Sequence, residues 1–183
     1  MIRPIVLYGD PVLRRAAQPV RLDDPELPRL LQDLWDTMYN AEGVGLAAPQ
    51  IGVSLQVFVV DAAPLQPEGE PPFKGVFLNP RLIAAGTACV PHEEGCLSIP
   101  GVRERVFRPD SIQLAYYDAQ GQLHERTFSG IVARIIQHEY DHLLGRLFVD
   151  YLSPVRRQLV RKRLYQIARG LVEVPYPTRA YAH

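Results

Sequence analysis

The segment Gln137–His142, with the sequence QHEYDH, constrains the fold of this chain more than any other feature. His138 and His142 are four residues apart, so on an α-helix their side chains project from nearly the same face. The neighbouring apolar residues follow helical spacing, and Gly145 stands where a helix commonly ends. Two imidazoles on one face can bind a common metal ion, and Glu139 beside them can accept a proton from a water that the ion activates. The segment therefore predicts a helix that carries a catalytic metal site.

Catalytic metal sites normally have a third protein ligand. After His142 the chain offers only distant carboxylates and the terminal His183, which is a poor route to a third ligand. Upstream, Cys96 lies between two glycines in the segment Glu93–Gly101, which we interpret as too irregular for a central strand. Cys96 is the better candidate, and it leaves one coordination position open. A thiolate softens the site and suits Fe(II), Co(II), Ni(II) or Zn(II).

The remaining pattern predicts an α+β fold. With 183 residues, 47% of them hydrophobic, the chain can form one domain, 1–183, with a substantial core. Asp23–Glu26 is expected to open a helix by a side-chain cap with Pro25 in the first turn, and Ser153-Pro154 opens another that ends at Gly170. The predicted strands are 53–60, 76–83, 102–107, 111–118 and 122–128, with a short edge strand at 171–174. We expect antiparallel or mixed sheets packed around the central metal-binding helix, with helices towards both termini.

The stretch 40–52 is rich in glycine and alanine and has two interpretations. It is a tight loop packed under a sheet, or it allows a ligand to approach the backbone closely. Two apolar residues near the histidine and glycine motifs, Val44 and Ile135, also have two interpretations. They line a pocket for an apolar substrate side chain, or they belong to the core, which helical spacing favours for Ile135.

Three segments, GVGLAAPQIG, EGCLSIPG and QHEYDHLLG, resemble in order and spacing the three signature motifs of the peptide deformylases. The resemblance implies that the metal ligands are Cys96, His138 and His142. It further implies that Glu139 is the general acid and base, and that Gln50 and the backbone N–H of Leu97 stabilise the oxyanion. Gly45 would contact the substrate through its backbone, and Val44 would line the methionine pocket.

The resemblance also implies a reaction and its partners. The family removes the formyl group from the N-terminal N-formylmethionine of nascent polypeptides and releases formate. Its metal is commonly one Fe(II) per chain, with Zn(II), Ni(II) or Co(II) as substitutes. Since the net charge is zero and no apolar run approaches a membrane span, we expect neither DNA nor membrane binding. We further expect a monomer in the bacterial cytoplasm.

Two other functions stay open at this stage. One is a zinc peptidase, which would cleave internal peptide bonds. The other is a metal-stabilised module that binds RNA or the ribosome near the exit tunnel, suggested by the six basic residues and absence of acids over 154–170. A solvated helix face explains the same charges. The helix breaks at Gly170, unlike the long helical tail of family members that dock on the ribosome.

Several single residues also have alternative interpretations. A closed structural metal site would take its fourth ligand from His92 or Cys89, although Cys89 is better explained as a small buried hydrophobe. Asp141 orients His142 or forms a structural ion pair. Glu94 is structural or holds the Cys96 segment, and Arg134 lies at the mouth of the site or in a salt bridge.

Overall fold

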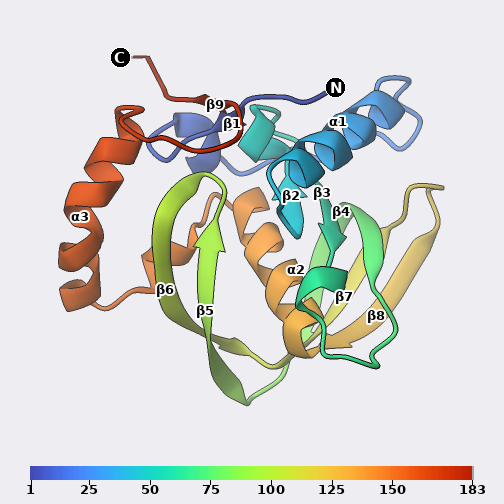
Figure 1. Cartoon of the computed structure of the whole chain (residues 1–183). Coiled ribbons are helices and arrows are strands. Elements are labelled where there is room, and N and C mark those ends of the chain that lie inside the picture. Colours follow the sequence, from blue (N-terminus) through green and yellow to red (C-terminus); the bar gives the residue numbers. More distant parts are fainter. Residues whose placement is uncertain (183) are drawn as a thin grey trace.

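The computed structural model describes residues 1–182 and has an α+β architecture (Figure 1). Three α-helices and nine strands occur in the described part of the chain. The helices are α1 (Leu27–Asn40), α2 (Gly130–Leu143) and α3 (Pro154–Ala168). The strands are β1 (Ile5–Val6), β2 (Gly45–Ala47), β3 (Val57–Asp61), β4 (Lys74–Ala85), β5 (Cys89–Cys96), β6 (Ile99–Pro109), β7 (Ser111–Tyr117), β8 (Leu123–Ser129) and β9 (Thr178–Arg179). Short 3-10 helices lie at Pro11–Arg14, Ala48–Ile51, Ala63–Leu65 and Phe148–Tyr151.

The strands form three sheets. A five-stranded antiparallel sheet has the order β2-β3-β4-β7-β8, β5 and β6 form a separate antiparallel hairpin, and β1 pairs in parallel with β9. Figure 1 shows α2 between the β5–β6 hairpin and the five-stranded sheet. The predicted fold class, with sheets around a central metal-binding helix, is confirmed.

The core holds α2 against the five-stranded sheet. Ala133 and Ile136 of α2 are fully buried in a cluster with Phe58 of β3 and Phe77 of β4, whose rings stack with centroids 4.6 Å apart. Burying aliphatic and aromatic side chains of this size contributes about 1.5–3 kcal/mol each. Because α2 is anchored on this side, its opposite side is directed towards the β5–β6 hairpin.

Most predicted elements are found, with shifted ends. The helix at 154–168 is capped as expected, since Ser153 Oγ accepts a hydrogen bond from the N–H of Arg156. The hairpin of β7 and β8 is confirmed. The expected strand at 53–60 begins only at Val57, since Ser54 and Gln56 exchange backbone hydrogen bonds with Gln18 and only the Gln56 carbonyl bonds to β4, at the N–H of Asn79.

Two predictions are wrong, those of the first helix start and of a strand at 171–174. The first helix begins at Leu27 rather than within 23–26, and its first-turn proline is Pro28, because the Asp24 carboxylate closes a turn onto the N–H of Glu26 before the helix starts. The segment leading to Cys96 is strand β5 of a two-stranded hairpin, and its register shifts between Gly95 and Cys96, so it is not a central strand, as predicted. Residues 171–174 form no strand; β9 lies further on, where β1 is available for pairing.

The three α-helices of the described residues are 14, 14 and 15 residues long. None of them is long and apolar enough to cross a membrane.

Candidate active site

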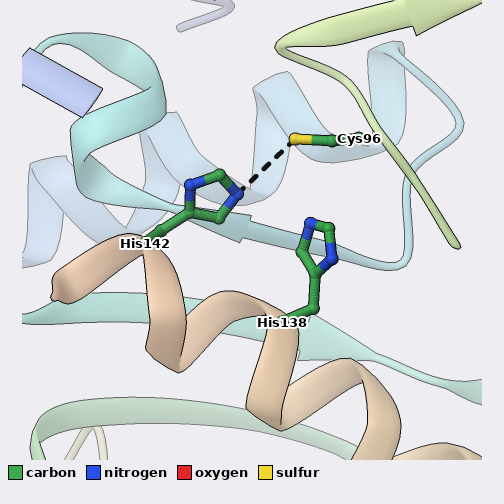
Figure 2. Close-up of side chains that lie close together, drawn as sticks. All are labelled: Cys96, His138 and His142. Atoms are coloured by element: carbon green, nitrogen blue, oxygen red, sulfur yellow. Dashed lines mark hydrogen bonds between the residues drawn. The ribbon is translucent and has the colours of Figure 1, made fainter. Parts of the chain in front are cut away.

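Three potential metal ligands come together between α2 and the end of β5. Figure 2 shows the rings of His138 and His142 rising from successive turns of α2 towards the Cys96 side chain. The ligand atoms of the three residues all lie within 4.8 Å of one another, and Cys96 Sγ is 3.5 Å from His142 Nε2. A tetrahedral ion bound at about 2.3 Å from sulfur and about 2.05 Å from nitrogen separates two such ligands by about 3.5 Å. The donor set and its spacing therefore fit a divalent transition metal.

Glu94 orients the first histidine. His138 donates from Nδ1 to Glu94 Oε1 at 2.9 Å in the tautomer that leaves Nε2 free for a metal ion. Burial alone would raise the pKa of the Glu94 carboxyl, but hydrogen bonds from His138 and Arg108 hold it well below its usual value. Arg134 also donates to Glu94, at 2.8 Å. The ionised carboxylate is thus fixed in place by three donors.

Arg108 connects this carboxylate to a second one. It donates to both oxygens of Glu94 at 2.7 and 3.0 Å, and its Nη1 donates to Asp141 Oδ2 at 2.7 Å. Tyr151 donates its hydroxyl to the same Asp141 oxygen at 2.8 Å. Asp141 is therefore an ion-pair residue, and no hydrogen bond joins it to His142. Removing one member of such a buried ion-pair network leaves an uncompensated charge and destabilises the fold.

Glu139 is a buried carboxyl next to the ligand group. It is 4% exposed, and its Oε2 is a buried atom without a hydrogen-bond partner in the described structure. Burial raises the pKa of Glu139 to about 7; the positive charge of His138 opposes this shift, and the negative charge of Glu94 adds to it. A carboxyl with a pKa near the working pH is suited to move protons in both directions. A buried carboxyl oxygen without a partner is uncommon in folded proteins, and a bound water or ion is one way to satisfy it.

Gln50 lies beside Cys96, one of the candidate ligands. Its Oε1 accepts a hydrogen bond from the N–H of Ala47 at 3.0 Å, which directs its Nε2 towards the site. Nε2 is 3.2 Å from Ser98 Oγ and 3.5 Å from Cys96 Sγ. Leu97, between these two residues, occupies the turn that joins β5 to β6. The two residues expected to stabilise an oxyanion thus lie beside the candidate metal ligand Cys96.

A cavity of about 580 Å³ opens onto this group. Val44 and Ile135 line the cavity and also pack in the core cluster under the sheet. Each residue is therefore both part of the pocket wall and part of the core. Gly45 lies against Glu139: a Cβ built on it would be 2.6 Å from Glu139 Oε1. Part of the glycine-rich stretch forms strand β2. Because Gly45 has no side chain, the backbone of this strand comes close to the Glu139 carboxyl group.

The other sequence candidates are distributed as follows. Cys89 is exposed, which contradicts its interpretation as a buried hydrophobe; its strand β5 has that end at the surface. His92 is exposed and lines the cavity, and neither residue belongs to the ligand group found within residues 1–182. Arg134 is buried in the salt bridge to Glu94 and also borders the cavity. The tail residue His183 lies outside the described residues.

Sequence reasoning did not find two contributors. Arg108 gave no local signal, because an alternating strand equally places arginine in solvent. Tyr176 lines the cavity from the C-terminal segment, and its hydroxyl donates to the carbonyl of Leu97 at 2.9 Å. Contacts between residues so distant in the chain leave no periodic pattern to read.

Two imidazoles and a thiolate beside a buried carboxylate, at the base of an open cavity, are the arrangement of a metal-dependent hydrolase. The model of the family described as polypeptide deformylase matches residues 2–158. The chain therefore belongs to the polypeptide deformylase family, which confirms the resemblance of its three motifs.

Individual relatives agree with this assignment. A peptide deformylase of Christiangramia forsetii is 44% identical over 98% of this chain and 96% of its own. The crystal structure of a peptide deformylase from Legionella pneumophila is 41% identical and superposes with a TM-score of 0.82, covering 93% of this chain and 98% of that one. The Met-Ala-Ser-bound class I type b enzyme of Acinetobacter baumannii is 34% identical, with a TM-score of 0.77 over 83% and 99% of the two chains.

Proposed function

We propose that this chain, as one catalytic domain, removes the formyl group from the N-terminal N-formylmethionine of nascent polypeptides and releases formate. Its reaction is the hydrolysis of a linear amide. The observation that carries the proposal is the group formed by Cys96, His138 and His142, whose ligand atoms lie within 4.8 Å of one another beside Glu139. The family and its relatives favour this reaction over cleavage of internal peptide bonds.

The metal proposed for this site is one Fe(II) per chain, with Zn(II), Ni(II) or Co(II) able to replace it. One thiolate and two imidazoles suit all four ions. When bound, the ion supplies Lewis acidity that polarises the formyl oxygen and lowers the pKa of a water. Glu94 contributes by holding the ring of His138 through Nδ1, so that the ring cannot rotate away from the ligand group.

Glu139 would act as the proton carrier. It takes a proton from the attacking water, whose oxygen bonds to the formyl carbon, and it gives the proton to the departing amine as the C–N bond breaks. The products are formate and a peptide with a free amino group. Nε2 of Gln50 and the backbone N–H of Leu97 would donate to the former carbonyl oxygen while it carries negative charge.

The substrate would bind as an extended strand along β2. This strand stands at one end of the five-stranded sheet, so it has one unpaired edge in that sheet. Edge strands can pair with an extended peptide through backbone hydrogen bonds. Gly45 would then contact the substrate backbone, and Val44 would border the pocket for the methionine side chain. The Acinetobacter relative that holds Met-Ala-Ser supports a short peptide as the occupant.

For its surroundings, we propose a monomer in the bacterial cytoplasm, where formylated chains are made. Contact with the ribosome near the exit tunnel would use α3. Within this helix Arg156 pairs with Glu104 and Arg157 donates to the carbonyl of Asp150, so the chain itself uses part of the basic charge. Reversing the charge of Arg161 and Lys162 and measuring co-sedimentation with ribosomes tests this partner.

The experiment that tests the proposed function measures formate release from formyl-Met-Ala-Ser by protein purified without oxygen. The acetylated peptide and the Glu139→Ala variant are run in parallel, with the metal content of each protein measured. We expect formate only from the wild type on the formyl peptide, and full metal content in both proteins. No formate at full Fe(II) or Ni(II) occupancy would refute the proposal, and shortened peptides that keep their formyl group would favour a peptidase.

A further inference from the structure

The C-terminal segment, residues 171–180, returns from α3 to the active site. After the helix the chain turns at Gly170, whose φ is +71°, and Figure 1 shows the segment running back from α3 to β9 beside β1. It is held at its far end, where the N–H of Ile5 donates to Pro177 O and the N–H of Leu7 donates to Arg179 O, both at 2.9 Å. The segment is thus fixed at both ends.

Burial along this segment alternates with a period of two, as in an extended strand. Five residues are half-buried and those between them are exposed; the half-buried ones are Val172, Val174, Tyr176, Thr178 and Ala180. Val172 and Ala180 pack against the apolar cluster that includes Ile167 of α3. One face of the segment therefore lies on the protein, and Val174 and Tyr176 on that face border the active-site cavity.

Tyr176 is joined to the turn that carries the active-site residues. Its ring packs against the same apolar cluster as the Leu97 side chain, and its hydroxyl donates to the Leu97 carbonyl at 2.9 Å. Leu97 and Ser98 lie in the turn between β5 and β6, where no strand ladder holds them. On the other side of the turn, the Ser98 carbonyl accepts from the N–H of Tyr8 at 2.8 Å.

Resting on the proposed function, we propose that Tyr176 is a positioning residue for deformylation. Its hydrogen bond fixes the Leu97–Ser98 peptide and so holds the turn that would present the Leu97 N–H to the substrate and the Cys96 thiolate to the metal. A hairpin turn moves as a unit, because rotation of one peptide plane displaces its neighbours. Residue 176 lies in the C-terminal segment, beyond the region 2–158 that the family model matches.

The test compares Tyr176→Phe with the wild type, because this change removes the hydroxyl and keeps the ring. We expect kcat on formyl-Met-Ala-Ser to fall about 3- to 10-fold, the effect of one neutral hydrogen bond, with KM within about twofold. Tm should fall by no more than about 4 °C. The matched control is Tyr165→Phe: this exposed tyrosine of α3 accepts from Arg169 at its hydroxyl, away from the cavity, and should behave as wild type.

A second readout reports on Cys96 directly. In protein loaded with Co(II), the thiolate-to-cobalt absorption should shift in Tyr176→Phe and stay unchanged in Tyr165→Phe. Wild-type kcat and an unchanged cobalt spectrum in Tyr176→Phe would overturn the inference, and so would a loss confined to KM. A wild-type protein that releases no formate would instead refute the proposed function, so the two failures are distinguishable.

Discussion

Replacing Gly45 with alanine should disable the proposed proton carrier without removing the metal. A Cβ at Gly45 would lie 2.6 Å from Oε1 of Glu139 and 2.9 Å from its Cδ and Cγ, inside the 3.0 Å that real Cβ atoms essentially never breach. The backbone of Gly45 is held in register with Val60 of β3, and α2 holds the backbone of Glu139. The side chain of Glu139 must therefore rotate out of its position by roughly half an ångström or more.

This displacement sets the size of the effect. A misplacement of about 1 Å in an active site can lower the rate by about 10²-fold, so we expect kcat to fall about 30- to 100-fold. This corresponds to about 2–2.7 kcal/mol of activation free energy. The three atoms nearest to the added methyl group all belong to Glu139 and none belongs to a candidate ligand, so we expect the metal content not to change.

The assay is formate release at saturating formyl-Met-Ala-Ser, with metal analysis of the same samples. Gly75→Ala is the control, because the three atoms nearest to its Cβ are ring atoms of Phe73 and Phe77, at 3.2 Å or more. We expect wild-type kcat from the control. If Gly45→Ala retained kcat within about threefold of wild type at full metal content, the role assigned to the position of Glu139 would be wrong.

Three further predictions concern stability and the metal. Arg108→Met leaves two buried carboxylates without a cation between them, so the free energy of unfolding should fall by about 3–5 kcal/mol and Tm, measured by circular dichroism, by about 6–20 °C. The control Arg21→Met breaks only an exposed pair and should leave Tm unchanged. A similar fall in Tm in both variants would contradict the reasoning. Removing metal with a chelator should abolish formate release, and adding Fe(II) or Ni(II) should restore it; full activity in metal-free protein would exclude the assigned chemistry. Burial alone would raise the pKa of Asp33, but hydrogen bonds from the Met1 ammonium and from Arg3 lower it below its usual value. The ionised Asp33 carboxylate therefore contributes its full stabilisation above about pH 4, and this stabilisation is lost as the pH falls through the folded-state pKa. In urea unfolding, the difference in free energy of unfolding between wild type and Asp33→Asn should be widest above about pH 4 and disappear in stronger acid.

The predictions from sequence succeeded where the signal is local. The helix that carries His138 and His142 follows from apolar spacing and from Gly145, which adopts a φ of +73° just after the helix. The β7–β8 hairpin follows from two alternating runs around a turn. The errors lie where strand pairing decides whether a segment forms a strand. Residues 53–56 and 171–174 have strand-like composition, but a strand also requires a neighbouring strand in register.

The wider candidate site was only partly predictable for the same reason. Glu94 stands two residues before Cys96, and its acidic side chain could suggest a structural role, but its bond to His138 spans 44 residues. Arg108 reaches Asp141 across 33 residues, in a pocket that exists only after the hairpin has packed on α2. Such contacts depend on how whole elements are placed, and a single sequence carries no record of that placement.

The local sequence was enough to predict the chemistry available to this protein: two imidazoles on one helical face, a carboxyl between them in the chain, and motifs typical of the deformylases. The placement of the imidazoles depends on helical periodicity, which acts over a few residues. The completion of the site depends on how the chain folds in three dimensions. The fold brings Cys96 to His142 across 46 residues and Tyr176 to Leu97 across 79, because hydrophobic burial and strand pairing, rather than local preference, position those segments.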